Sequence, residues 1–133
     1  MEEHNNWIVY VCFMHGSNEI VSGSSLGDVK FWDLRNMQSS IDTQDVQRSM
    51  TAFVSHPRIP LLASGSQFNF IKVFTPDGDV LQVIRNHRTN TARKIGPVSI
   101  LAFHQNKPML AAGATDEIIS IYESSPEHKK NGK

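Results

Sequence analysis

The hydrophobic positions of this chain form short runs that recur three times, each followed by the same kinds of residue at the same spacing. Each unit opens with an apolar run, reaches a step of small residues around a glycine, and ends nine positions later on an aromatic residue; the units span residues 9–32, 50–74 and 98–122. The first two of these glycines are 42 residues apart and the last two 48. The glycines are Gly23, Gly65 and Gly113, and the aromatics are Trp32, Phe74 and Tyr122. A repeat of this length, with several short strands in each unit, is typical of β-propeller blades.

The third unit shows the strand pattern most clearly. Residues 98–103 are apolar on both faces, which is typical of a strand whose sheet packs between two other sheets. A polar turn ending in Pro108 separates this strand from a second one over 109–112, and a third strand rich in β-branched residues is predicted over 117–122. Between them, Gly113 is expected to let the chain pass close to another backbone.

The fourth strand differs among the units. In the middle unit, Pro76 and Gly78 suit a turn, and residues 80–84 return as a fourth strand. In the first unit a weaker fourth strand is predicted over 37–43. In the third unit none follows Tyr122, and residues 124–133 are predicted to be a disordered basic tail.

These patterns together predict an all-β fold with one domain over residues 1–123. We expect a partial β-propeller of about three blades, over residues 7–43, 49–85 and 97–123, whose last blade lacks its outer strand. Propellers close with about four to eight blades, so we expect the chain to need further N-terminal blades and to be a fragment or short product of a longer protein. In isolation it should expose apolar blade faces and associate or aggregate; a sharp monomer with cooperative unfolding would contradict this.

Composition narrows the class of protein. The 133 residues carry a formal net charge of zero. No run approaches the roughly 18 consecutive apolar residues that a membrane span needs. The acidic start does not resemble a signal peptide, so we predict a cytoplasmic protein with no direct membrane insertion. Balanced charge, and cations without interleaved aromatics, argue against nucleic-acid binding. The single Cys12 lies in an apolar run, and we interpret it as a small buried hydrophobe.

Candidate catalytic and metal-binding residues are weak. His15, His56 and His104 occupy the same turn in different units, so the repeat itself holds them apart, and we interpret them as structural. No metal-ligand spacing, nucleophile elbow or complete phosphate-binding loop is present. We therefore predict no enzyme activity, no catalytic residue, no metal and no cofactor.

One loop stands out as a possible protein-binding segment. Residues 85–94 carry four fixed positive charges and no acid, and they account for the longer second spacing. Such a loop could hold a phosphate or an acidic strip of a partner; the plainer alternative is a solvated linker. The cations are Arg85, Arg88, Arg93 and Lys94.

Two aromatic residues flank Asn69 where a turn is expected. One of them, Phe68 or Phe70, is a candidate anchor for a partner protein. The alternative is that both simply fill the space between blades.

The end of the first unit carries a family resemblance. Residues 29–35, read as VKFWDLR after the SGS step at 22–24, resemble the end of a WD repeat. The Gly-His pair that often opens such repeats is missing. Of the three turn positions where the repeat usually has Asp, only Asp116 keeps it, while Leu26 and Phe68 stand at the other two.

The last two units carry a narrower resemblance in six segments: 59–66 (IPLLASGS), 71–74 (IKVF), 78–85 (GDVLQVIR), 94–104 (KIGPVSILAFH), 110–116 (LAAGATD) and 119–122 (ISIY). These segments are similar to the terminal propeller of the Raptor family, the regulatory-associated proteins of the TOR kinase. The resemblance implies a non-catalytic scaffold subunit of TOR complex 1 that brings substrates to the kinase, has subunits of the TOR kinase complex as partners, and is recruited to lysosomal or vacuolar membranes. The alternative is a generic WD-repeat interaction subunit of another assembly.

Overall fold

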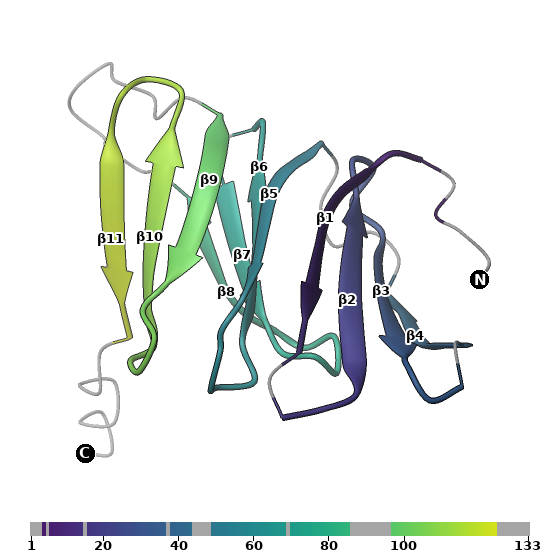
Figure 1. Ribbon diagram of the computed structural model, residues 1–133. Helices are drawn as coiled ribbons and strands as arrows, with labels where there is room; N and C mark the ends of the chain where they lie inside the picture. The colour runs from purple at the N-terminus through teal and green to yellow at the C-terminus, as the bar shows by residue number, and fades with distance from the viewer. Residues whose placement is uncertain are drawn as a thin grey trace, which may run out of the picture.

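The computed structural model of the chain describes residues 4, 6–14, 16–36, 38–43, 49–68, 70–85 and 97–124. Over these residues the chain forms β-strands and no helix, so none that is long and apolar enough to cross a membrane. The strands make three antiparallel sheets that stand side by side in chain order (Figure 1). This confirms the predicted all-β fold, a partial β-propeller of three blades.

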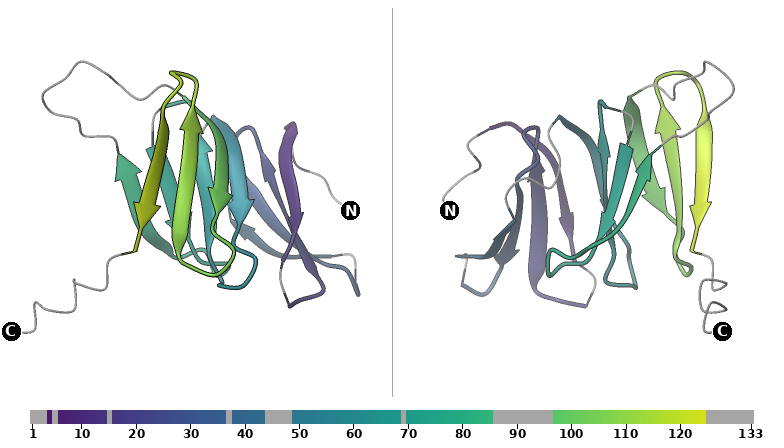
Figure 2. Two further views of the ribbon diagram at one scale, coloured as in Figure 1. Left: turned by 60° about the vertical axis from the view of Figure 1, so that its left-hand side comes forward. Right: turned by 180° about the vertical axis from the view of Figure 1, so that it is seen from behind.

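Each blade is a meander in which neighbouring strands follow one another in sequence. The first two sheets have four strands each, and the third has three within the described residues, which confirms the blade without an outer strand. The sheets fan out from the side where β5 lies between β1 and β9 and contacts both (Figure 2). The strands are β1 Ile8–Phe13, β2 Glu19–Ser24, β3 Val29–Asp33, β4 Gln38–Thr43, β5 Met50–Ser55, β6 Leu62–Ser66, β7 Phe70–Phe74, β8 Val80–Arg85, β9 Val98–Phe103, β10 Met109–Ala114 and β11 Ile119–Glu123.

Turn chemistry sets several strand boundaries. Gly78 has φ of 94°, as its place in the predicted turn required. The strand predicted from residue 117 begins instead at Ile119, because Glu117 has φ of 68° and its N–H donates to the carbonyl of Ala114 in the β10–β11 turn. Its β-branched neighbours concealed this turn in the sequence. Of the predicted tail, only Ser124 lies within the described residues.

The hydrophobic core lies between blades rather than inside any one of them. One cluster joins the first and second blades, and its rings include Phe53 and Phe74 with centroids 6.0 Å apart. A second cluster joins the second and third blades and contains Val98 and Leu101 of β9 together with Ile71 of β7. Burying one such side chain stabilises the fold by roughly 1.5–3 kcal/mol, so each blade depends on its neighbour for stability.

The glycines of the first two small-residue steps, Gly23 and Gly65, lie in close contact with the next blade. A Cβ on Gly23 would lie 3.0 Å from Sδ of Met50, and a Cβ on Gly65 would lie 2.5 Å from Cγ1 of Val98. The sequence predicted close passage beside a backbone. At these two positions the neighbour is instead an apolar side chain from the first strand of the next blade.

Only one face of β9 is covered. Val98 and Leu101 are buried against the second blade, but Ile100 on the other face is exposed. The prediction that this strand is packed on both faces is therefore wrong for the chain as it stands. The apolar character of both faces was read correctly, but nothing in the described part of the chain covers the outer one.

Candidate functional site

The side chains of the described turn histidines make hydrogen bonds to backbone groups of their own turns. Nδ1 of His56 accepts hydrogen bonds from the backbone N–H groups of Arg58 and Ile59, each at 3.0 Å. Nε2 must then carry the proton, and it donates to the carbonyl of Lys107 in the third blade at 2.9 Å. His104 repeats the first half of this pattern, because its Nδ1 accepts from the N–H groups of Asn106 and Lys107. His15 lies outside the described residues.

A buried polar network was missed in the sequence. The hydroxyl of Ser22 accepts the indole N–H of Trp32 at 2.8 Å and is 2.6 Å from Nε2 of His4, and all three residues are buried. His4 takes the place of the network histidine that the Gly-His pair of a WD repeat usually supplies. Leu26, at the usual Asp position, is exposed. The only signal in the sequence was a histidine ahead of the first strand. Since this Ser–His pair is out of solvent and already engaged by Trp32, it ties strands together and presents no accessible nucleophile.

Cys12 is half-buried at the contact between the first two blades. It packs against the first core cluster and lies beside Ser55 of β5. Burial raises the pKa of the thiol from its ordinary 9.0 to about 11, although hydrogen bonds from Ser55 oppose the shift. The thiol therefore stays protonated at neutral pH, as suits a small apolar group.

One ion pair stands at the end of β3. The side chain of Arg35 donates to both carboxylate oxygens of Asp33, at 3.0 and 2.8 Å. These hydrogen bonds, with one from the backbone N–H of Arg35, hold the pKa of Asp33 at about 2. Arg35 is exposed and Asp33 is half-buried, and the pair fixes the turn after Trp32 rather than forming a reactive centre.

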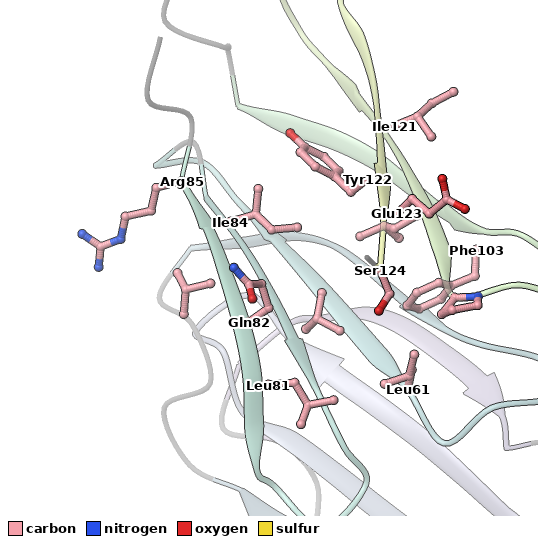
Figure 3. Close-up of a pocket in the computed structure, with 14 residues that line it drawn as sticks. Leu61, Leu81, Gln82, Ile84, Arg85, Phe103, Ile121, Tyr122, Glu123 and Ser124 are labelled. Carbon is pink, nitrogen blue, oxygen red and sulfur yellow. The ribbon is translucent and has the colours of Figure 1, made fainter. Parts of the chain in front are cut away.

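A groove lies between the second and third blades. It has a volume of about 830 Å³ and runs between β8, the outer strand of the second blade, and β11, the last strand of the third. Ile84 of β8 and Tyr122 of β11 point into the space between these two strands, and Phe103 and Leu61 lie deeper along it (Figure 3). The groove is also lined by Gln82, Glu123 and Ser124, so it combines mostly apolar side chains with a few polar groups.

One wall of this groove is a sheet edge. β11 pairs with β10 on one side, and within the described residues no strand pairs with its other side. Free N–H and C=O groups on an edge strand can accept a further extended segment, as in strand addition. The groove and the edge together suit an extended polypeptide better than a small molecule.

The structure describes three of the predicted partner-binding residues, and two of them, Phe70 and Arg85, pair across β7 and β8. Phe68 is 65% exposed in the β6–β7 turn. Phe70 is half-buried in β7, with Nζ of Lys72 5.9 Å from its ring centroid. Arg85 ends β8 and points away from the groove (Figure 3). The other three cations, Arg88, Arg93 and Lys94, lie outside the described residues.

Within the described ranges, no group of three or more His, Cys, Asp or Glu side chains is placed to hold a metal ion. What this part of the chain offers is surface: a groove, a sheet edge and apolar faces.

Comparison with known proteins agrees with this architecture. Residues 1–33 match the family described as WD domain, G-beta repeat. The chain is 45% identical over 105 residues to the regulatory-associated protein of TOR 1 of Arabidopsis thaliana, covering 78% of this chain and 8% of that protein. It is 34% identical over 125 residues to the target of rapamycin complex 1 subunit mip1 of Schizosaccharomyces pombe, covering 91% of this chain and 9% of that protein. The chain thus spans less than a tenth of the length of these relatives.

A solved structure shows the same arrangement of blades. The crystal structure of Chaetomium thermophilum Raptor superposes with a TM-score of 0.78 at 26% identity, covering 90% of this chain and 11% of that one. The similarity therefore extends through all three blades, including the first, where the sequence resemblance was loosest.

Proposed function

We propose, from the premise that this chain is a WD-repeat β-propeller segment related to Raptor proteins, that it serves as a non-catalytic part of a TOR complex 1 scaffold. In this role it contributes to TOR kinase signalling by providing surface for protein partners, among them subunits of the kinase complex, and so supports substrate recruitment. It acts in the cytoplasm and reaches lysosomal or vacuolar membranes as part of that assembly.

The observation that carries this proposal is the identity of 45% over 105 residues to a regulatory-associated protein of TOR. Identity at that level extends beyond the glycines and aromatics that any propeller blade needs. Fold alone would support only an interaction module, because one fold hosts many functions.

The geometry supports a role in holding proteins rather than in catalysis. The buried Ser22–His4 pair is engaged by Trp32, and His56 and His104 are used by backbone groups of their own turns. By contrast, the groove between β8 and β11 is open and bordered by a sheet edge. A rigid set of strands with open apolar surface is suited to recruitment of other proteins.

The test is co-purification from cells that carry an affinity tag on the endogenous protein containing this segment. TOR kinase should be recovered in stoichiometric amount, and a variant with the groove blocked by Ile84→Arg should be compared with Arg85→Glu, whose side chain points away from the groove. Recovery of a different assembly without TOR kinase would contradict the proposal and favour a generic WD-repeat subunit. Full recovery of the kinase with both variants would place the contact elsewhere on the protein.

A further inference from the structure

The two ends of the described structure present the two halves of the contact that joins its blades. We propose that the 133-residue chain, on its own, uses these halves to close a ring with a second copy of itself. This goes beyond the scaffold role, because it concerns an assembly that the isolated chain forms without any other subunit.

The first half of the contact is a receiving face on the third strand of each blade. Val29, Ile71 and Ile119 are equivalent, because each pairs with the central glycine of its own blade. Val29 is 0% exposed and Ile71 3% exposed, since the next blade covers them, whereas Ile119 is 77% exposed. The third blade therefore presents, uncovered, a face that the other two blades bury.

The second half is an inserting face on the first strand of each blade. Val11, Phe53 and Leu101 are equivalent, because each pairs with the residue just before the central glycine. Phe53 is 2% exposed and Leu101 7% exposed against the preceding blade, but Val11 is 58% exposed, and Phe13 beside it is also exposed. The first blade therefore presents an inserting face that no receiving face covers within the described residues.

The registers also predict how the two faces fit. Val98 and Met50 sit over the glycines of the preceding blades, and both pair with the residue just after their own blade's glycine. Ile8 is the equivalent residue of the first blade and is exposed. In the pair, Ile8 of one copy would lie over Gly113 of the other, between the exposed side chains of Ile100 and Ile119.

A second copy is the occupant that this arrangement favours, because one molecule carries both complementary faces. A contact between unlike faces propagates head to tail and ends only when the ring closes. Two copies of three blades make six, which is within the four to eight that propellers use. Closure covers both apolar faces of both copies at once, whereas an open chain of copies always leaves two faces exposed to water.

The proposal is tested by sedimentation of the wild-type chain and of two single variants. The chain has a mass of 14.9 kDa, and the wild type should sediment as a closed pair of twice that mass. Val11→Glu and Ile119→Glu each place a charge in both contacts of the ring, so each should weaken the pair at least about tenfold and sediment as a monomer. Because both side chains are exposed, both variants should keep the strand signal in circular dichroism.

Mixing the two variants makes the test specific to unlike faces. A mixed pair brings the intact inserting face of Ile119→Glu against the intact receiving face of Val11→Glu, so the mixture should form a dimer with one good contact. Val80→Glu, at an exposed apolar position at the start of β8 that belongs to neither face, is the matched control and should leave the pair intact.

Several results would overturn the proposal. A wild-type chain that stays monomeric at high micromolar concentration would mean that the faces are covered only by blades of another polypeptide. A ladder of larger species would mean that the contact forms but the ring does not close. Failure of the mixed variants to dimerise, or loss of the pair in Val80→Glu, would place the contact on other surfaces.

Discussion

Gly65 of β6 lies directly under Val98 of β9, so closely that a Cβ on the glycine would be 2.5 Å from Cγ1 of the valine. The two residues come from different blades and are 33 positions apart. Their contact sets the distance between the second and third sheets. The glycine is therefore needed because it lacks a Cβ and lets one blade pack closely on the next, and not because the chain turns there.

Gly65→Ala should lower the free energy of unfolding by about 1–3 kcal/mol, because the methyl group overpacks a closed contact. Combined with Val98→Ala, which opens the space, its effect should shrink, giving a coupling of about 1 kcal/mol in a double-mutant cycle. Urea unfolding of the wild-type chain, the two single variants and the double variant gives the four free energies of the cycle. Gly16→Ala is the control, because a Cβ there meets nothing within 4 Å and its penalty comes from φ of 72°. If the effects of Gly65→Ala and Val98→Ala are as additive as those of Gly16→Ala and Val98→Ala, the packing account is refuted.

Ser22→Ala should destabilise the chain by about 1–3 kcal/mol, because it leaves the buried indole N–H of Trp32 without its acceptor. Ser22→Thr keeps the hydroxyl and should restore part of that loss. The near-ultraviolet circular dichroism of Trp32 and urea unfolding together report the change. Equal stability of the alanine and wild-type chains would show that the network does not hold the first blade.

His56→Ala should cost about 2–3 kcal/mol of unfolding free energy, since it removes two turn hydrogen bonds and the bond to Lys107 of the next blade. His104→Ala is the internal comparison, because its side chain is exposed and no bond to another blade is described for it. Its loss should be about 1 kcal/mol or less. If the two substitutions cost the same, the bond between the blades contributes nothing.

Cys12 should react slowly with iodoacetamide at pH 8, with a rate that climbs until about pH 11, because burial raises the pKa of its thiol to about 11. The folded chain holds this proton more tightly than the unfolded chain, whose thiol titrates near 9.0. Stability contributed by this group is therefore complete below pH 9 and declines as pH rises from 9 towards 11.

Mass spectrometry after timed alkylation gives the rate at each pH, and the urea-unfolded chain is the reference. Cys12→Ser should remove the alkylation and its pH-dependent part of stability. A folded-state rate profile that matches the unfolded chain would contradict the burial of this thiol between the blades.

Local chemistry along the sequence determines much of the architecture. The alternation of apolar runs, the Pro76–Gly78 turn and the spacing of the three glycines suffice to place strands, because strand and turn formation depend on neighbouring residues. The end of the third strand pattern at Tyr122 likewise predicted a three-stranded last sheet. Some strand boundaries were misplaced. The start of β11 was missed because the left-handed φ of Glu117 has no signature in a run of β-branched residues, and β10 continues through Gly113 to Ala114 beyond the predicted 109–112.

Contacts between distant segments were decided by the tertiary structure alone. That His4 reaches Ser22, that Val98 covers Gly65, and that Tyr122 faces Ile84 across a groove all depend on how whole blades are set against one another. The sequence marks Ile100 and Val98 alike as apolar strand residues. Which of them is buried depends on whether a neighbouring sheet is present, because burial belongs to the assembly of blades and not to the strand.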